Sequence, residues 1–230
     1  MLKYIFNISF CLLAFFQVNG QGDKYVPSAL RLSAEVANFG YSLLKDNYDT
    51  WEFEADVDFD RYFLVVDYGY ARYSLNEPYF QYEGEGNYFR VGPDVNFIKS
   101  RRLLNFLAFG FRYAHSNFRE DLTYSTYNSL EPETSWPEES LSYSESGIKG
   151  RWFEMNTSLK ANIFNNFYMG FTVRYKLLPS SIKTGTFSTY YIPGFGKWVN
   201  NSNWGLSYYV SYRIPFRKKK QVNILDQIGN

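Results

Sequence analysis

Cysteine and histidine are almost absent from this sequence, which holds one of each in 230 residues. The single cysteine, Cys11, lies within an apolar run near the start of the chain. A chain with one cysteine cannot form an internal disulfide, and one histidine with no mature cysteine does not supply the ligands of a zinc site. The sequence therefore predicts no disulfide framework, no metal site and no cofactor.

Long apolar runs are also missing once the first twenty residues are set aside. Residues 1–20 combine Lys3, the apolar run Ile5–Phe16 and a small-residue end, which is the pattern of a cleaved secretory signal peptide. No small-residue lipobox precedes Cys11, so we expect no lipoprotein anchor. No later stretch approaches the roughly 20 apolar residues that a transmembrane helix requires.

The chain also lacks a marked excess of positive or negative charge. The chain has 24 Lys and Arg against 23 Asp and Glu, and cleavage after Gly20 removes Lys3 and leaves the two in balance. This balance argues against a nucleic-acid-binding protein.

Aromatic residues are abundant instead, at 21% of the chain with 22 Tyr and 22 Phe. Globular proteins use far fewer. A secreted chain of this composition without helical spans is typical of a transmembrane β-barrel, in which lipid-facing residues alternate with polar lumen-facing ones and aromatic girdles mark the interfaces.

The clearest strand is Trp51–Asp60, where apolar and acidic residues alternate without exception. This period of two places Trp51 and Phe53 on one face and Glu52 and Glu54 on the other. A strand of a soluble β-sandwich has the same pattern, so this segment alone does not decide between the two folds.

Seven further alternating segments are predicted strands, at residues 30–37, 64–71, 89–97, 107–114, 153–161, 167–176 and 204–214. Pro93 interrupts one of them and predicts a bulge or an edge defect. The connections alternate between long ones (Phe39–Thr50, Ser74–Gly86, Ser116–Gly150 and Leu178–Asn203) and short ones (Arg61-Tyr62, Lys99–Arg102 and Asn165-Asn166).

This alternation favours an all-β fold, namely an eight-stranded antiparallel transmembrane β-barrel with long extracellular loops and short periplasmic turns. A soluble β-sandwich or periplasmic domain is the alternative. The predicted organisation is a signal peptide at 1–20, an N-terminal periplasmic segment at 21–29, the β-barrel at 30–216 and a basic, polar periplasmic tail at 217–230. Both termini are then periplasmic and the protein is a multi-pass component of the cell outer membrane.

Charged residues on the inward-facing positions predict an ion-pair network in the lumen. Its expected members are Arg31, Glu35, Glu52, Glu54, Asp56, Asp58, Asp67, Arg90, Asp94, Arg112, Glu154, Lys160, Arg174 and Arg213. The acids concentrate on one strand and the bases on several others, so closure of the barrel is needed to bring them together. An eight-stranded barrel is just wide enough for side chains to fill it, so we expect a plugged lumen. A proton or cation path along Glu52–Asp60 is the alternative.

The C-terminal third carries the most recognisable motifs. Ile163–Phe171, Tyr191–Gly196 and Trp204–Phe216 resemble an uncharacterised, domain-of-unknown-function family of small outer-membrane barrels of the Bacteroidota type. The resemblance implies a barrel and brings no catalytic residues. Trp204–Phe216 also resembles the terminal signal by which barrels are recruited for membrane insertion, although a basic tail follows it here.

Catalytic signals are weak. His115 and Ser116, with Glu120 close in sequence, resemble the pair used by barrel lipid A deacylases, but adjacent residues of one strand point to opposite faces. The acidic stretch 116–150 is an alternative site for surface adhesion or for lipopolysaccharide bridging through divalent cations. The candidate partner or lipid contacts are Tyr191, Pro193, Phe195, Arg217, Lys218, Lys219 and Lys220. The apolar segment 190–195 is expected to pack either over the barrel mouth or against another protein. The basic residues would attract anionic headgroups or dock a periplasmic partner.

The sequence therefore predicts a non-enzymatic barrel that acts as a structural or accessory subunit of a larger envelope assembly, such as outer-membrane protein biogenesis or secretion machinery. The expected partners are outer-membrane lipid, both lipopolysaccharide and phospholipid, the barrel-insertion machinery and other envelope proteins. No nucleic acid is expected. The alternatives are the surface role of residues 116–150 and a lipid-modifying enzyme that uses His115.

Overall fold

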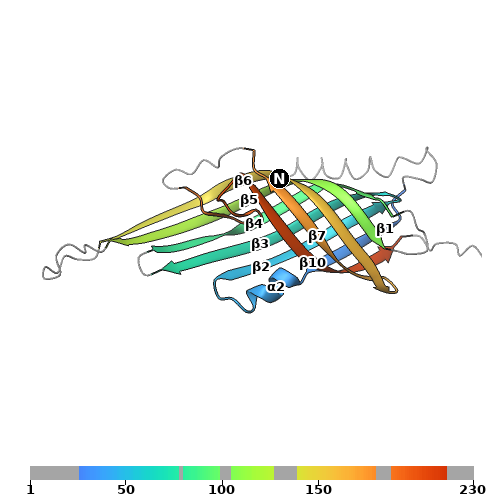
Figure 1. Cartoon of the computed structure of the whole chain (residues 1–230), viewed down its shortest axis with the longest axis horizontal. Helices are drawn as coiled ribbons and strands as arrows, with labels where there is room; N and C mark the ends of the chain where they lie inside the picture. Colours follow the sequence, from blue (N-terminus) through green and yellow to red (C-terminus); the bar gives the residue numbers. More distant parts are fainter. Residues whose placement is uncertain (1–25, 78–79, 99–104, 127–138, 180–187, 217–230) are drawn as a thin grey trace, which may run out of the picture.

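Eight antiparallel strands close into a β-barrel in the computed structural model of the chain (Figure 1). The structure describes residues 26–77, 80–98, 105–126, 139–179 and 188–216. The barrel strands are β1 (Ala29–Glu35), β2 (Tyr48–Phe59), β3 (Tyr62–Glu77), β4 (Phe80–Asn96), β5 (Phe106–Thr126), β6 (Glu139–Phe164), β7 (Phe167–Leu177) and β10 (Ser202–Pro215). The predicted fold of eight antiparallel strands in a ring is confirmed.

The barrel closes where the first and last strands meet. β1 pairs with β2 on one side and with β10 on the other, and Ala29 is the partner of both Asp58 and Pro215. The two ends of the barrel sequence therefore lie at the end of the barrel that carries the tight turns at residues 60–61 and 165–166. Asp60 and Asn165 adopt positive φ in these turns, a conformation that Asp and Asn tolerate better than other non-glycine residues.

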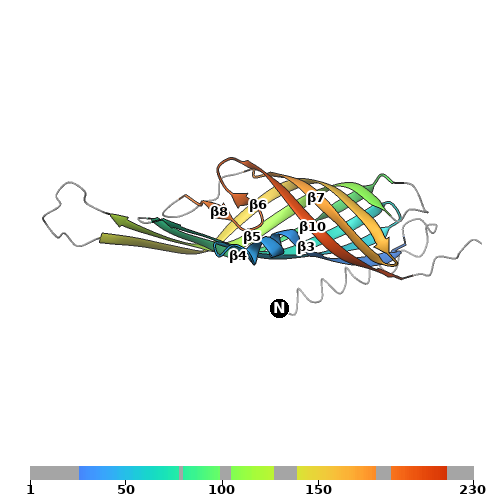
Figure 2. The same ribbon diagram turned by 60° about the horizontal axis from the view of Figure 1, so that its bottom comes forward.

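Four strands continue well beyond the barrel at the opposite end. β3 and β4 stay paired out to Glu77 and Phe80, and β5 and β6 stay paired out to Thr126 and Glu139. Figures 1 and 2 show these strands projecting as a sheet from one side of the barrel mouth. The predicted loops Ser74–Gly86 and Ser116–Gly150 were therefore wrong over most of their length. Near the barrel, Phe118, Glu120 and Leu122 are buried on one face. Further out, serine, glycine and charge occupy both faces because neither face is buried, which removes the alternation that marks a strand.

Three smaller predictions also need correction. Val36 and Ala37 do not continue the first strand, because Val36 caps the helix α2 (Ala37–Ser42). The segment after β7 is not a plain loop, since β8 (Tyr191–Ile192) and β9 (Gly196–Lys197) form a short hairpin. The turn after β2 is formed by residues 60–61, with Tyr62 already in β3.

Pro93 lies within a continuous β4 and disturbs only the pairing with β5. The ladder holds at Val91, is interrupted at Gly92 and Pro93, and resumes at Asp94 in the same register. Because proline lacks the N–H that a ladder bond needs, the defect is a gap on the β5 side. The predicted defect in pairing is present, and the alternative of a bulge is wrong.

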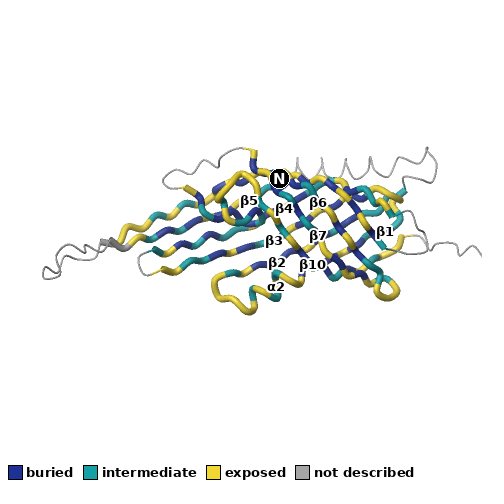
Figure 3. The backbone as a smooth tube through the Cα atoms, in the orientation of Figure 1, coloured by how far each residue is buried: buried dark blue, intermediate teal, exposed yellow. Residues whose placement is uncertain are grey.

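The wall of the barrel carries apolar side chains on its outer face and charged side chains on its inner face. A soluble protein has the opposite arrangement. Along β3, Tyr62, Leu64, Val66 and Tyr68 are between 42% and 50% exposed on the outer face. Exposed apolar residues continue round the barrel at Leu32, Phe53, Phe89, Leu107, Phe109, Phe111, Phe153, Leu159, Met169, Phe171, Leu206, Tyr212 and Ile214. Figure 3 shows exposed and buried residues alternating along the strands of the wall. These outward residues form what we call the apolar belt. Among the described residues, no helix is both long and apolar enough to cross a membrane.

Candidate functional site: the charged lumen and the barrel mouth

The centre of the lumen holds a cluster of charges around Glu52 on β2. Arg90 of β4 donates to Glu52 at 2.8 Å and Arg174 of β7 donates to it at 3.2 Å. Tyr88 and Tyr209 donate their hydroxyls to the same carboxylate. Glu52 therefore binds side chains from three other strands, β4, β7 and β10, which only closure of the sheet makes possible.

The same two guanidinium groups also contact a carboxylate of β6, across the lumen, and a carboxylate of β3, the strand next to β2. Glu154 lies 3.0 Å from Arg90 and 3.5 Å from Arg174, and Asp67 lies 3.8–4.0 Å from Arg90, Arg112 and Arg174. All five side chains are less than 5% exposed. Charges this deeply buried are tolerated because they are paired, and removal of one partner leaves another charge unpaired.

A second group of charges fills the lumen toward the tight-turn end. Lys160 pairs with Glu54 and lies 3.7 Å from Asp56. Arg31 pairs with Asp56 at 3.4 Å and its guanidinium carbon lies 4.9 Å from the centre of the Phe106 ring. Arg31 also lies over the rings of Phe63 and Tyr168. Phe63 and Phe106 belong to a small buried apolar cluster with Val65 and Ala108.

The other expected members of the network are distributed more widely. Arg112 makes a two-point contact with Asp94, and Arg213 meets Asp58 at 3.1 Å where both are more than 10% exposed. Asp60, at the end of the acidic strand, is exposed in the turn.

Glu35 is buried but makes no ion pair among the described residues. Its carboxylate accepts the backbone N–H groups of Ala37, Asn38 and Phe39 at the start of α2, and that of Tyr208 on β10. The expectation that Glu35 joins an ion-pair network was wrong. A carboxylate that precedes a helix satisfies the free N–H groups of the first turn, and this use of Glu35 follows from the helix that sequence reasoning missed.

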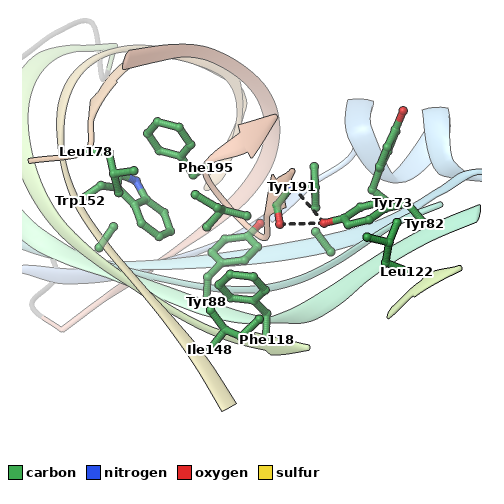
Figure 4. Close-up of a cluster of buried hydrophobic side chains, with 13 residues drawn as sticks. Tyr73, Tyr82, Tyr88, Phe118, Leu122, Ile148, Trp152, Leu178, Tyr191 and Phe195 are labelled. Atoms are coloured by element: carbon green, nitrogen blue, oxygen red, sulfur yellow. Dashed lines mark hydrogen bonds between the residues drawn. The ribbon is translucent and has the colours of Figure 1, made fainter. Parts of the chain in front are cut away.

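The β8–β9 hairpin closes the mouth above the charges. Tyr191, Ile192 and Phe195 are at most 5% exposed and pack against Trp152 and Tyr88 (Figure 4). The contact depends on Gly194, whose φ is +81° and whose added Cβ would lie 2.5 Å from the Tyr88 ring. Of the two alternatives expected for this segment, packing over the barrel mouth is the one observed. Contact of Tyr191, Pro193 and Phe195 with a partner or lipid is not, because all three are buried there.

Glu120 fixes the segment before this hairpin to the projecting sheet. Its carboxylate accepts hydrogen bonds from Tyr82, from the Thr189 hydroxyl at 2.9 Å and from the Tyr190 backbone at 3.2 Å. Glu120 lies beyond the apolar belt, since its neighbours Arg119 and Asp121 are charged and face outward. Burial raises the pKa of the Glu120 carboxyl, and these hydrogen bonds offset part of that effect.

Because its folded-state pKa is raised, Glu120 binds its proton more tightly in the folded protein than in the unfolded chain. Its contribution to stability is present at low pH and is lost as pH rises through the raised pKa. We expect the thermal midpoint of the wild type to rise relative to that of Glu120→Gln as pH is lowered from about 7 toward about 5. A difference between the two proteins that stays constant over this range contradicts the assignment.

A known family matches nearly the whole length of the chain. A domain of unknown function, DUF6048, matches residues 1–219. The chain belongs to the DUF6048 family. No functionally curated protein matches its sequence.

Two solved structures resemble this DUF6048 chain, both of Ail, the attachment invasion locus protein of Yersinia pestis. The first has a TM-score of 0.43 at 12% identity and covers 82% of this chain and 100% of Ail. The second, Ail in complex with the heparin analogue sucrose octasulfate, has a TM-score of 0.37 at 11% identity and covers 81% and 97%.

The pair suggested as catalytic does not assemble in the DUF6048 chain. His115 faces outward and its ring lies 5.5 Å from that of Phe89, whereas Ser116 is fully buried and donates to the Asn87 carbonyl. Glu120 is buried on the inner side with Ser116 and away from His115. Nucleophilic catalysis needs the hydroxyl and the base within hydrogen-bond reach, and this arrangement does not provide that.

We therefore expect His115→Ala to leave the acyl-chain composition of lipid A unchanged in cells that express the protein. The measurement is a lipid A mass profile of cells with the wild type, the variant and no protein. A profile that changes with the wild type and reverts with His115→Ala would restore the enzyme hypothesis.

The acidic stretch 116–150 also differs from its prediction. Glu120 is buried, while Arg119 binds Glu85 at 2.7 Å on the outer face. Among the described residues, no group of three or more His, Cys, Asp or Glu is placed to hold a metal ion. Residues 127–138, the basic residues Arg217–Lys220, the turn 99–102 and the signal peptide lie outside the described part of the chain, so the predictions for them stay predictions.

Proposed function

We propose that the protein is a non-enzymatic, non-conducting barrel of the outer membrane and that it acts as a structural or accessory subunit of an envelope assembly. The observation that carries the membrane location is the apolar belt around a charged lumen. A soluble barrel would expose this belt to water, where contiguous apolar patches beyond a few hundred Å² are rare. In a bilayer the same surface meets acyl chains.

The orientation follows from the general arrangement of such barrels, with tight turns in the periplasm and long connections outside. With the signal peptide at 1–20, this arrangement places both termini in the periplasm and the projecting β3–β6 sheet beyond the outer surface. The resemblance to barrels of the Bacteroidota type supports a Gram-negative envelope as the setting, with lipopolysaccharide and phospholipid as the surrounding lipids.

The lumen supports a role without transport. Buried ion pairs cross it at several heights, and the β8–β9 hairpin fills its mouth with Tyr191, Ile192 and Phe195. An eight-stranded barrel has no space to spare once its inward side chains are packed. We therefore expect no steady current through the protein in a planar bilayer, in contrast to the alternative of a cation path along Glu52–Asp60.

The projecting sheet is the part of the molecule best placed to meet another protein. The apolar 191–195 segment no longer supports a partner contact, because it is buried. The outer portions of β5 and β6, by contrast, stay paired while Leu141 and Tyr124 are 49% and 40% exposed. Strands that are already paired before binding lose less conformational freedom on binding than an unpaired loop does, which favours recognition.

The experiment is to extract the protein in mild detergent and to measure its native mass and what co-purifies. A matched variant removes residues 123–142 and joins Leu122 to Tyr143, which are paired in register, through an Asn-Gly turn. The proposal predicts a stoichiometric complex with the wild type and its loss in the shortened variant, while both remain in the outer membrane. A lone monomer in both cases contradicts it.

Surface adhesion through the outer portions of β5 and β6 is the second candidate, since these two strands reach furthest from the barrel (Figure 2). It predicts that the shortened variant loses attachment of whole cells to a host surface, with no envelope complex in the wild type.

A further inference from the structure

Two positively charged side chains lie on the outer face of β6 directly beyond the apolar belt. Lys149, Arg151 and Phe153 are exposed, while the neighbouring Ile148 and Trp152 are buried in the apolar cluster of the barrel mouth. This alternation places both cations on the same outward face as Phe153, a residue of the belt. Arg151 is therefore the first charged side chain that β6 presents beyond the lipid-facing surface.

The neighbours of these cations on β5 are neutral at pH 7 or weakly basic. Arg151 is opposite His115 and Lys149 is opposite Asn117 in the pairing of the two strands. Side chains directly opposite each other on one face of an antiparallel pair have their Cβ atoms about 4.5–5.5 Å apart. The four side chains therefore form one continuous polar surface, which we call the rim patch.

The rim patch has no acid to balance its positive charge. Neither Lys149 nor Arg151 lies within 4.0 Å of a carboxylate in the part of the chain that the structure describes. The nearest acids along β6 belong to the other face of the strand. Glu154 is buried in the lumen, and Glu145 is the register partner of Glu120, which is buried on the inner side.

The two other outward cations of the projecting sheet are neutralised. Arg72 of β3 binds Glu83 at 2.7 Å, and Arg119 of β5 binds Glu85 at 2.7 Å. An acid at this distance leaves little net charge for another molecule to recognise. The rim patch therefore differs from the rest of this outer surface, because its two positive charges are not balanced by the described residues.

The height of the rim patch matches a layer of lipid headgroups. The rings of Phe153 and Tyr113 lie 5.8 Å apart at the end of the belt, as in the aromatic girdle of a membrane barrel. With a rise of about 3.4 Å per residue and a tilt of about 40°, Arg151 lies about 5 Å and Lys149 about 10 Å beyond Phe153 along the membrane normal. A headgroup layer is about 5–7 Å thick. Arg151 therefore lies within this layer and Lys149 at its outer boundary.

We propose that the rim patch binds the phosphate monoester of a lipid headgroup in the outer leaflet, through Arg151 and Lys149. The inference rests on the proposed function, because only the outer-membrane location and orientation bring headgroups to this face. The guanidinium group binds phosphate at two points and the ammonium group acts as a point charge.

The charge of the rim patch selects the class of lipid. Its two unpaired positive charges match a phosphate monoester, whose charge is about −1.5 to −2 at pH 7, better than the singly charged diester of an ordinary phospholipid. In the Gram-negative envelope proposed above, lipopolysaccharide is the lipid that supplies such a monoester. The rim patch is then the place where the barrel holds one molecule of its surrounding lipid.

The test titrates the full-length protein in a neutral detergent with monophosphoryl lipid A, and native mass spectrometry counts the lipid that stays bound. The same lipid without its phosphate is the second arm, because its sugars and acyl chains are unchanged. We expect the phosphorylated lipid to bind at least about tenfold more tightly, since only it forms the charge-assisted hydrogen bonds. Inorganic phosphate at an equal concentration should not displace it, because the acyl chains also contact the belt.

Lys149→Gln combined with Arg151→Gln should remove the preference for the phosphorylated lipid. Both positions are exposed, so the barrel is expected to fold. Arg72→Gln combined with Arg119→Gln is the matched control, because it changes the net charge by the same amount on the same outer face but at cations that already have acidic partners. The control should keep the preference at the wild-type level.

Three results overturn the proposal. An equal loss of preference in both double variants shows an effect of net charge alone. A wild-type preference in the Lys149 and Arg151 variant shows that the rim patch does not hold the phosphate. Loss of an acidic protein partner from that variant, with lipid binding unchanged, assigns the rim patch to a protein instead.

The faster gel migration of the unheated, folded barrel is recorded for every variant. A folded membrane barrel that binds both forms of the lipid equally refutes the phosphate site and leaves the proposed function standing. A protein that does not insert refutes both.

Discussion

Replacing Arg90 with alanine is expected to lower the free energy of unfolding by about 3–5 kcal/mol. Arg90 lies 2.8 Å from Glu52, 3.0 Å from Glu154 and 3.9 Å from Asp67, and its guanidinium also lies over the Tyr88 ring. Its removal leaves three buried carboxylates with weaker compensation and opens a void. Reversible urea unfolding in lipid vesicles measures the change.

Arg72→Ala is the matched control, since Arg72 binds Glu83 at 2.7 Å on the outer face where the two side chains are 48% and 29% exposed. An exposed pair is worth roughly 0–1 kcal/mol. A further variant, Arg90→Met with Glu154→Gln, should recover part of the loss because it removes one stranded charge along with its partner. Equal effects of Arg90→Ala and Arg72→Ala would show that the lumen charges do not hold the barrel together.

Val66→Arg is expected to cost about 2–4 kcal/mol in a bilayer, the price of a cation at the midplane of a barrel's lipid face. Val66 is 43% exposed at the middle of the outward row that runs from Tyr62 to Tyr68 on β3. In water the same substitution would be nearly neutral, because the side chain points outward. The fraction that folds into lipid vesicles as urea is diluted measures the cost.

Leu141→Arg provides the comparison, because Leu141 is 49% exposed but lies on the part of β6 that projects beyond the barrel. A surface substitution in water costs less than about 0.5 kcal/mol. Equal costs at Val66 and Leu141 would mean that the belt does not contact lipid.

The strands and their inward and outward faces were accessible from the sequence because a barrel wall has different solvents on its two sides. Glu52, Glu54 and Asp56 alternate with Phe53 and Ala55 only because each residue faces one environment along its whole strand. The alternation of inward and outward positions along such a strand therefore predicts which charged residues face the lumen. It does not predict which acid meets which base, since that depends on how the sheet is sheared when it closes.

The features that the sequence did not predict lie where the strands leave the barrel wall, so that their two faces no longer meet lipid on one side and the lumen on the other. Beyond the belt, β5 and β6 run as a sheet whose outer part has neither face fully buried, so Ser140, Ser142 and Ser144 are tolerated there and resemble a loop. Glu35 matched the parity of the lumen positions, but its carboxylate serves the backbone of α2, a helix that the alternating pattern concealed.

The sequence of the apolar loop also did not determine that Tyr191 and Phe195 are buried in the barrel mouth. An apolar segment between strands packs either into its own barrel or against another molecule, and composition alone does not distinguish these outcomes. The deciding residue is Gly194, whose positive φ turns the hairpin inward against Tyr88.

The most direct test of the membrane barrel is the fate of the native protein during fractionation. The account predicts that it stays with the outer membrane after carbonate washing and that the unheated protein migrates faster on a detergent gel than the boiled one, as a closed barrel does. Release into the soluble periplasmic fraction, with migration that heating does not change, would contradict it.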